Sequence, residues 1–336
     1  MRALRRPRRN EEAPRLLSLA LQGGGSFGAF TWGVLDRLLE EDGIAFDVLS
    51  GTSAGAVNAV LLADGLAAGG PEEARQRLRQ FWKRASDAAL FMPFGRLAGA
   101  GAVASAATTT LALSTQLVSP YQFNPLGLNP LRTALADLVD FERLRKASPL
   151  RLLVAATQVR NGRLRLFRET ELTLDAVLAS ACLPLLHHAI EIEGEWYWDG
   201  GLSANPPLRQ AVMASETDDV VIVQLTPENL DEVPQLSPAI HRRVSQIAFN
   251  SPLQMEIETI ADLCERCRKE GLFRSRFCRK LQRLRLHRIA AEDAVDGLDR
   301  TSALNLDWAF LTRLMESGRR AAEKWLAELT ASAPSQ

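Results

Sequence analysis

Gly51-Thr52-Ser53-Ala54-Gly55 stands between two segments of different character. Residues 46–49 form a short apolar run typical of a strand, and residues 54–66 are typical of a helix. A Gly-x-Ser-x-Gly sequence in this context is typical of a sharp turn, where the glycines make room and the serine hydroxyl is presented to a substrate. The positive end of the helix dipole points to the same place and would stabilise a developing oxyanion. We therefore predict that Ser53 is a nucleophile.

A second glycine-rich turn precedes this one. Residues 16–21 predict a buried strand, Gly23-Gly24-Gly25 follows it, and residues 26–41 have apolar side chains at helical spacing. The repeated order of strand, glycine loop and helix predicts an α/β fold with a mainly parallel sheet. The three glycines can aim backbone N–H groups at one point, so they are the candidates for an oxyanion hole. A nucleotide-phosphate loop is the alternative, but residues 23–28 complete neither common glycine pattern of such loops.

The whole chain is predicted to form one elaborated domain, with a mostly helical tail from about residue 238. The predicted elements are hairpins at 151–158 with 163–167 and at 189–192 with 195–198, helices at 72–86, 174–182 and 306–326, and strands at 220–225 and 284–289. We assign the chain as follows: a disordered basic arm (1–14), a catalytic domain (15–226) with an insert or lid (88–129), and a mostly helical extension packed on the same domain (227–336).

A carboxylate is the predicted base. Asp199 follows the strand residues Trp196-Tyr197-Trp198 and precedes Gly200-Gly201, so its side chain would be presented at an open strand end. A carboxylate can take the serine proton directly when it is hydrogen-bonded to the serine and partly shielded from water. A conventional triad would require a histidine instead. The histidines lack a distinctive loop context and are expected to be structural or surface residues: His187, His188, His241 and His287.

Three motifs, in this order, resemble those of the patatin-like phospholipase family: Gln22-Gly23-Gly24-Gly25-Ser26-Phe27-Gly28, Gly51-Thr52-Ser53-Ala54-Gly55 and Asp199-Gly200-Gly201. The resemblance covers about residues 16–225 and implies a three-layer α/β/α fold. It implies a dyad of Ser53 as nucleophile and Asp199 as proton acceptor, without a cofactor or a metal. It assigns the oxyanion hole to Gly23, Gly24 and Gly25, and supporting roles to Gly51, Gly55, Gly200 and Gly201.

One position departs from the family pattern. Phe27 stands where the family usually has arginine or lysine, two positions after the third glycine. The missing cation weakens the expectation of a phospholipid headgroup near the reaction centre more than it weakens the expectation of ester hydrolysis. The leading hypothesis is a serine acyl hydrolase that acts on lipid esters. The alternatives are a short-chain carboxylesterase or polyester depolymerase with the same dyad, and a catalytically idle lipid-binding regulatory protein.

Charge is balanced overall but uneven along the chain. The sequence has 40 Lys+Arg and 40 Asp+Glu, yet the arm carries five arginines, and residues 264–288 carry ten Lys or Arg against two acidic residues. We expect these basic segments and the apolar insert to give peripheral contact with an anionic membrane surface. A solvated helix face is the alternative for residues 264–288. Nucleic acid is not expected as a partner. The expected location is the cytoplasm, with peripheral attachment to the inner membrane face.

The cysteines show no disulfide framework, which is typical of a reducing cytoplasm. Cys264-x-x-Cys267 with Cys278 and His287 offers a zinc site as an alternative, but the second half lacks the close pair of ligands typical of such sites. We expect these residues and Cys182 to be ordinary thiols. No secretory signal is expected, and the uncharged residues 97–120 are too rich in small side chains to predict a membrane span.

Overall fold

A computed structural model of the protein describes residues 14–91, 118–230, 232–269, 276–295 and 302–331. A central sheet has the strand order β5-β6-β3-β2-β1-β7-β8, and β4 also pairs with β3. Neighbours among β3, β2, β1, β7 and β8 are parallel, whereas β4, β5 and β6 pair antiparallel. The strands are β1 Arg15–Leu21, β2 Ile44–Thr52, β3 Arg151–Gln158, β4 Leu164–Arg168, β5 Ile190–Ile192, β6 Glu195–Asp199, β7 Asp219–Gln224 and β8 Arg285–Ala290. The predicted α/β class with a mainly parallel sheet is confirmed.

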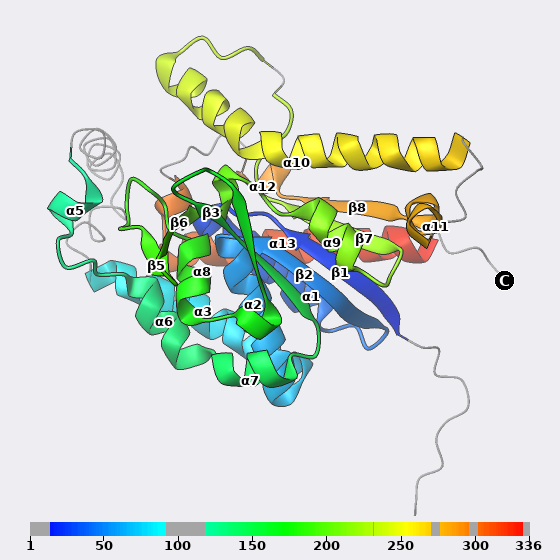
Figure 1. Cartoon of the computed structure of the whole chain (residues 1–336), viewed down its shortest axis with the longest axis horizontal. Helices are drawn as coiled ribbons and strands as arrows, with labels where there is room; N and C mark the ends of the chain where they lie inside the picture. The colour runs from blue at the N-terminus through cyan, green and yellow to red at the C-terminus, as the bar shows by residue number, and fades with distance from the viewer. Residues whose placement is uncertain (1–13, 92–117, 231, 270–275, 296–301, 332–336) are drawn as a thin grey trace, which may run out of the picture.

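Helices cover both faces of the sheet, which gives three layers (Figure 1). Side chains alternate along a strand, so Leu19 and Leu21 pack in one core cluster and Ala20 in another. The helices α1 Gly28–Leu38, α2 Ala54–Gly69, α3 Pro71–Phe91 and α13 Trp308–Ala331 contribute to the first cluster. The second cluster contains side chains from α9 Leu208–Ala214, α10 Ser237–Lys269 and α11 Arg276–Arg283. Both faces of the central strands are therefore buried, as their continuous apolar sequence requires.

Smaller elements connect these layers. The connecting α-helices are α5 Pro120–Phe123, α6 Pro130–Leu138, α7 Phe141–Ala147, α8 Leu174–Ser180 and α12 Glu292–Val295. The 3-10 turns are η1 Gly25–Phe27, η2 Glu169–Glu171, η3 Gly200–Leu202 and η4 Ser302–Leu304. Within the predicted insert at 88–129, α3 continues to Phe91 and α5 occupies Pro120–Phe123, so both described ends of the insert contain helical residues. Most of the insert, and the arm up to residue 13, lie outside the described residues.

The C-terminal part of the chain shares the core of the sheet domain. β8, which corresponds to the strand predicted at 284–289, extends the sheet beyond β7. α13 packs so tightly on α1 that a Cβ atom on Gly33 would overlap the carbonyl oxygen of Met315, and one on Gly318 would overlap that of Phe30. The close approach of two backbones explains glycine at both positions.

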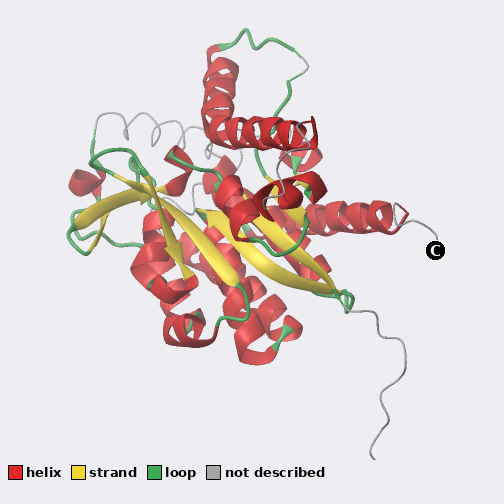
Figure 2. Ribbon diagram, turned by 45° about the vertical axis from the view of Figure 1, so that its right-hand side comes forward, coloured by secondary structure: helices red, strands yellow, loops and turns green. Residues whose placement is uncertain are grey.

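The helix α10 is 33 residues long and bends (Figure 2). Pro252 lies inside it. Proline removes one helical hydrogen bond and its ring clashes with the preceding turn, so a bend is expected there. None of the helices in the described part of the chain is both long and apolar enough to cross a bilayer.

Candidate active site

Ser53 occupies the turn between β2 and α2. It is the residue immediately after β2 and the N-cap of α2, with φ 53° and ψ −124°. This left-handed conformation is strained for a residue with a side chain and is typical of a nucleophile turn. A Cβ atom on Gly51 would lie 2.6 Å from the amide nitrogen of Ala56, and one on Gly55 would overlap the carbonyl oxygen of Leu21. The turn can therefore close only because both flanking residues are glycine.

The surroundings of Ser53 are tighter than the sequence suggests. The serine is only 7% exposed, although an open turn was expected. Gly23 packs against it, since a Cβ atom on Gly23 would lie 2.9 Å from Ser53 Cβ. The Ser53 amide donates a hydrogen bond to Ser180 Oγ at 3.0 Å, and Ser180 is fully buried at the end of α8. The first glycine loop and the end of α8 thus enclose the nucleophile turn.

Asp199 lies at the same level of the sheet as Ser53. Thr52 pairs with Ala155 of β3, and Asp199 pairs with the next residue, Ala156, on the same edge of that strand, because β4 pairs with residues 153–157 along the other edge. β6 therefore ends directly beyond the end of β2 along the same edge of β3, which brings Asp199 next to the turn that holds Ser53. The side chain of Asp199 is buried, and its Oδ1 accepts a hydrogen bond from the Gly201 amide at 2.8 Å.

One short segment of the chain is hydrogen-bonded both to Ser53 and to Asp199. The Asp199 amide donates to the carbonyl oxygen of Cys182 at 2.8 Å, two residues after Ser180, whose hydroxyl holds Ser53. We call residues 180–182 the strap. Sequence reasoning missed Ser180, because a serine near the end of an apolar helix has no distinctive pattern. The strap brings the two predicted catalytic residues into one hydrogen-bonded unit.

The strap also contains a buried thiol. Burial, and next the negative charge of Asp199, raise the pKa of Cys182 to about 12. Its Sγ donates a hydrogen bond to the carbonyl oxygen of His188 at 3.0 Å. Cys182 therefore stays protonated at neutral pH and does not act as a thiolate nucleophile beside Ser53.

The glycine loop is held from two directions. The Gly23 amide donates to Asn205 Oδ1 at 2.8 Å, so one of the three predicted oxyanion donors already has a partner inside the protein. Gln22 Oε1 accepts from the amides of Leu225 and Thr226, and its Nε2 donates to Asn250 Oδ1 at 2.8 Å. Asn205 and Asn250 were missed. Asn205 follows Asp199 by six residues, whereas nothing in the helical sequence around Asn250 points to the site.

Phe27, the departure from the family pattern, packs on the C-terminal part of the chain. Its ring lies 6.5 Å from that of Phe310 of α13, and it borders the main core. The residue that replaces the usual cation thus belongs to an apolar contact between η1 and α13. The contact accounts for the aromatic residue without a role in substrate binding.

The histidines have other environments. His287 Nε2 lies 2.7 Å from Asp219 Oδ1, at the amino end of β7, away from the carboxyl ends of the strands where Ser53 lies. His241 is exposed on α10. Burial, with the neighbouring His188, lowers the pKa of His187. His188 stacks on Tyr121 with ring centroids 4.1 Å apart. Among the described residues, none of these rings forms a hydrogen bond with Ser53.

The zinc alternative is not supported by the described part of the chain. No group of three or more His, Cys, Asp or Glu side chains gathers there to hold a metal ion. Cys267 Sγ and Cys278 Sγ lie 2.8 Å apart, but His287 binds Asp219 instead.

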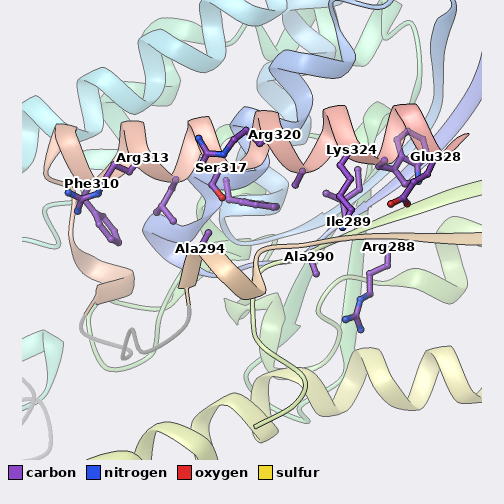
Figure 3. Close-up of a pocket in the computed structure, with 14 residues that line it drawn as sticks. Arg288, Ile289, Ala290, Ala294, Phe310, Arg313, Ser317, Arg320, Lys324 and Glu328 are labelled. Carbon is purple, nitrogen blue, oxygen red and sulfur yellow. The ribbon is translucent and has the colours of Figure 1, made fainter. Parts of the chain in front are cut away.

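Two cavities lie away from the dyad. One, of about 580 Å³, runs between β8 and α13 and is lined by arginines, Lys324 and apolar residues that include Phe310 and Trp325 (Figure 3). The other, also about 580 Å³, lies beside the β5–β6 hairpin and includes Tyr121 and Trp196. Neither is lined by Ser53 or Asp199. The cavities therefore do not identify the candidate active site, which rests on the hydrogen bonds and the strand register.

A family model described as patatin-like phospholipase matches residues 19–212, which is more than half of the chain. The chain belongs to the patatin-like phospholipase family. The members of this family are broadly lipid acyl hydrolases. The matched residues include the glycine loop, Ser53, Asp199 and Asn205, whereas α10, β8 and α13 lie beyond them.

The crystal structure of VipD from Legionella pneumophila is similar at 16% sequence identity and a TM-score of 0.40. The match covers 91% of this chain and 67% of the VipD chain. None of the curated proteins matches this patatin-like chain.

Proposed function

We propose that this protein is a serine acyl hydrolase that cleaves carboxylic ester bonds of lipids, with Ser53 as nucleophile and Asp199 as proton acceptor. The observation that carries the proposal is the strap, because Ser180 holds the Ser53 amide while the Cys182 carbonyl holds the Asp199 amide. The strained φ of Ser53 supports the nucleophile role, since strain of this kind gathers at functional sites.

The proposed reaction has two halves. Ser53 Oγ attacks the acyl carbonyl carbon while its proton passes to the carboxylate of Asp199. The tetrahedral intermediate then collapses, the proton passes to the leaving alcohol, and an ester of Ser53 remains. Water attacks this ester with Asp199 again as the base, which releases the fatty acid and restores the serine.

The oxyanion requires donors that are not already used. The Gly23 amide is bonded to Asn205, so we assign the donor role chiefly to the amides of Gly24 and Gly25. The amino end of α2, which begins at Ala54 directly after Ser53, adds its dipole at the same place. Gln22 holds this loop against the end of β7, which fixes the donors before substrate arrives.

A variant series tests this proposal. Ser53→Ala and Asp199→Asn should each lower kcat/KM on p-nitrophenyl acyl esters by about a thousand-fold or more, because one lacks the nucleophile and the other cannot accept its proton. A fluorophosphonate probe should label the wild-type protein and not Ser53→Ala. Ser317→Ala, on the distant α13, is the matched control and should behave as wild type.

The substrate class needs a second measurement. Rates across acyl chain lengths, with phospholipid vesicles included, separate lipid hydrolysis from short-chain ester hydrolysis. Normal turnover by Ser53→Ala or Asp199→Asn would refute the dyad. A wild-type protein that neither reacts with the probe nor hydrolyses any ester would favour the idle lipid-binding alternative.

A further inference from the structure

An exposed apolar stripe runs over residues 236–255, mostly along the amino-terminal half of α10. Leu236, just before the helix, is 75% exposed, Val244 is 59% exposed and Ile247 is 51% exposed. Ile240 and Met255 are also exposed. The spacings of three, four and eight residues place these side chains on one side of the helix. We call these five residues the α10 stripe.

Between the ends of the α10 stripe, the charged residues of the sequence have one sign. Residues 237–255 contain two arginines, Arg242 and Arg243, and no aspartate or glutamate. The nearest acidic residues along the chain, Glu232 and Glu256, lie beyond the ends of the stripe. An apolar helix face that carries arginines is complementary to the surface of an anionic bilayer.

The α10 stripe lies next to the candidate active site. Asn205, which holds Gly23, donates through Nδ2 to the carbonyl oxygen of Phe249 at 3.3 Å. The neighbouring Asn250 accepts the hydrogen bond from Gln22. Ile247 thus lies two residues before the part of α10 that contacts the site. In Figure 2 this half of the helix projects beyond the body of the protein.

The basic segment 264–288 fits a membrane contact less well than the sequence suggested. Arg283 pairs with Asp218, Arg285 pairs with Asp219, and Arg288 pairs with Glu228 and Glu292. Asp218 and Asp219 lie at the amino end of β7, whereas Ser53 lies at the carboxyl end of β2. Much of this charge is neutralised within the protein, and a membrane bound at Arg283 and Arg285 would lie at the wrong end of the sheet.

We propose that the α10 stripe is the surface through which the protein docks on an anionic lipid bilayer. The inference rests on the proposed function, because it is the lipid substrate that makes a bilayer the partner at this edge of the site. Docking through the α10 stripe places the glycine loop and Ser53 beside the lipid, so the ester need not travel through water. A second copy of the chain is the competing occupant, and the test below separates it.

The test compares two exposed apolar positions at opposite ends of the molecule. The double variant Val244→Glu/Ile247→Glu places charge in the α10 stripe. The control Met213→Glu places one such charge at a residue that is 55% exposed on α9. The end of α9 lies near the amino end of β3, because the carbonyl oxygen of Ala214 accepts from Arg151.

Flotation with vesicles of phosphatidylglycerol and phosphatidylcholine measures docking. The double variant should partition at least tenfold more weakly than wild type, which corresponds to about 1.4 kcal/mol, and should lose hydrolysis of vesicle lipid. Its hydrolysis of a soluble short-chain p-nitrophenyl ester should not change. Met213→Glu should match wild type in all three assays. Ser53→Ala should float normally without hydrolysis, so failure of the chemistry is distinguishable from failure of docking.

Three results would overturn the proposal. One is wild-type flotation by the double variant. Another is a wild-type protein that does not bind these vesicles. The third is a wild-type dimer, measured by light scattering, that the double variant turns into monomers, since a second copy would then cover the α10 stripe.

Discussion

At the scale of single residues, the site depends on small polar side chains that hold backbone groups. Ser180 accepts from the Ser53 amide, and Asn205 accepts from the Gly23 amide. Both side chains are fully buried. A buried backbone amide without a hydrogen-bond partner is costly. Each of these side chains therefore fixes its loop by accepting a hydrogen bond from the buried amide.

Ser180→Ala tests this positioning role. Loss of the hydroxyl leaves the buried Ser53 amide without its acceptor, which should lower the free energy of unfolding by about 1–3 kcal/mol. We expect kcat to fall while KM stays near wild type, because the nucleophile is misplaced and the substrate surface is intact. Ser180→Thr, which keeps the hydroxyl, should recover part of kcat. Equal kcat in Ser180→Ala and wild type would show that Ser180 does not position Ser53.

At the scale of elements, the sequence predicts strands and turns better than it predicts contacts. The two glycine turns, the hairpin strands and β8 have local signatures, and the structure confirms them. The bend of α10 follows from Pro252, but its contact with Gln22 depends on residues more than 200 positions apart. Asn250 could not be predicted because its role exists only after the chain has folded. The enclosure of Ser53 was missed for the same reason.

Gly33→Ala tests the contact between α1 and α13. In an exposed helix this change would stabilise by up to about 1 kcal/mol. Here the new methyl group would overlap the backbone of Met315, so we expect destabilisation of about 1–3 kcal/mol or more. Urea unfolding measures the difference. Gly43→Ala, at a loop position where a Cβ atom has no neighbour within 4 Å, is the control and should be nearly neutral. A stabilised Gly33→Ala would contradict the close packing.

Asp219 of β7 bonds to side chains of β8 and β1, so its ionisation makes the stability of the sheet depend on pH. Burial opposes its ionisation, but hydrogen bonds from Arg285 of β8, His287 of β8 and Arg15 of β1 hold its pKa well below the ordinary 3.8. A lowered pKa contributes stability that is fully present above the unfolded value and is lost as pH falls toward the folded value.

Asp219→Asn should therefore cost stability at pH 7, by about 3 kcal/mol since a buried charge network loses one partner. The difference between wild type and Asp219→Asn should shrink as pH falls below about 4. Denaturant unfolding at several pH values measures it. Asp218→Asn, at a more exposed ion pair, is the control and should show a smaller effect. A difference that stays constant down to acid pH would contradict the linkage.

At the scale of the whole molecule, the family match ends at residue 212, but the core does not. β8 and α13 supply Ile289, Leu311 and Leu314 to the same cluster as β1 and α1. We propose that residues 15–226 and 227–336 form one folding unit. A chain that ends at residue 226 should be insoluble or lack a cooperative unfolding transition, because it exposes the α1 face and the β7 edge. A soluble fragment with cooperative thermal unfolding would show two separate domains.

The strap has a consequence for how the site tolerates motion. Ser53 follows β2 and Asp199 ends β6, two strands that pair with the same edge of β3 but not with each other, and both residues are hydrogen-bonded to residues 180–182. A fluctuation that shifts this peptide moves Ser53 and Asp199 in the same direction, so the distance between them changes little. Because both residues are attached to the same segment, they move together and keep their relative position. If Ser53 and Asp199 form the proposed dyad, this arrangement keeps the nucleophile and the base aligned when nearby loops move.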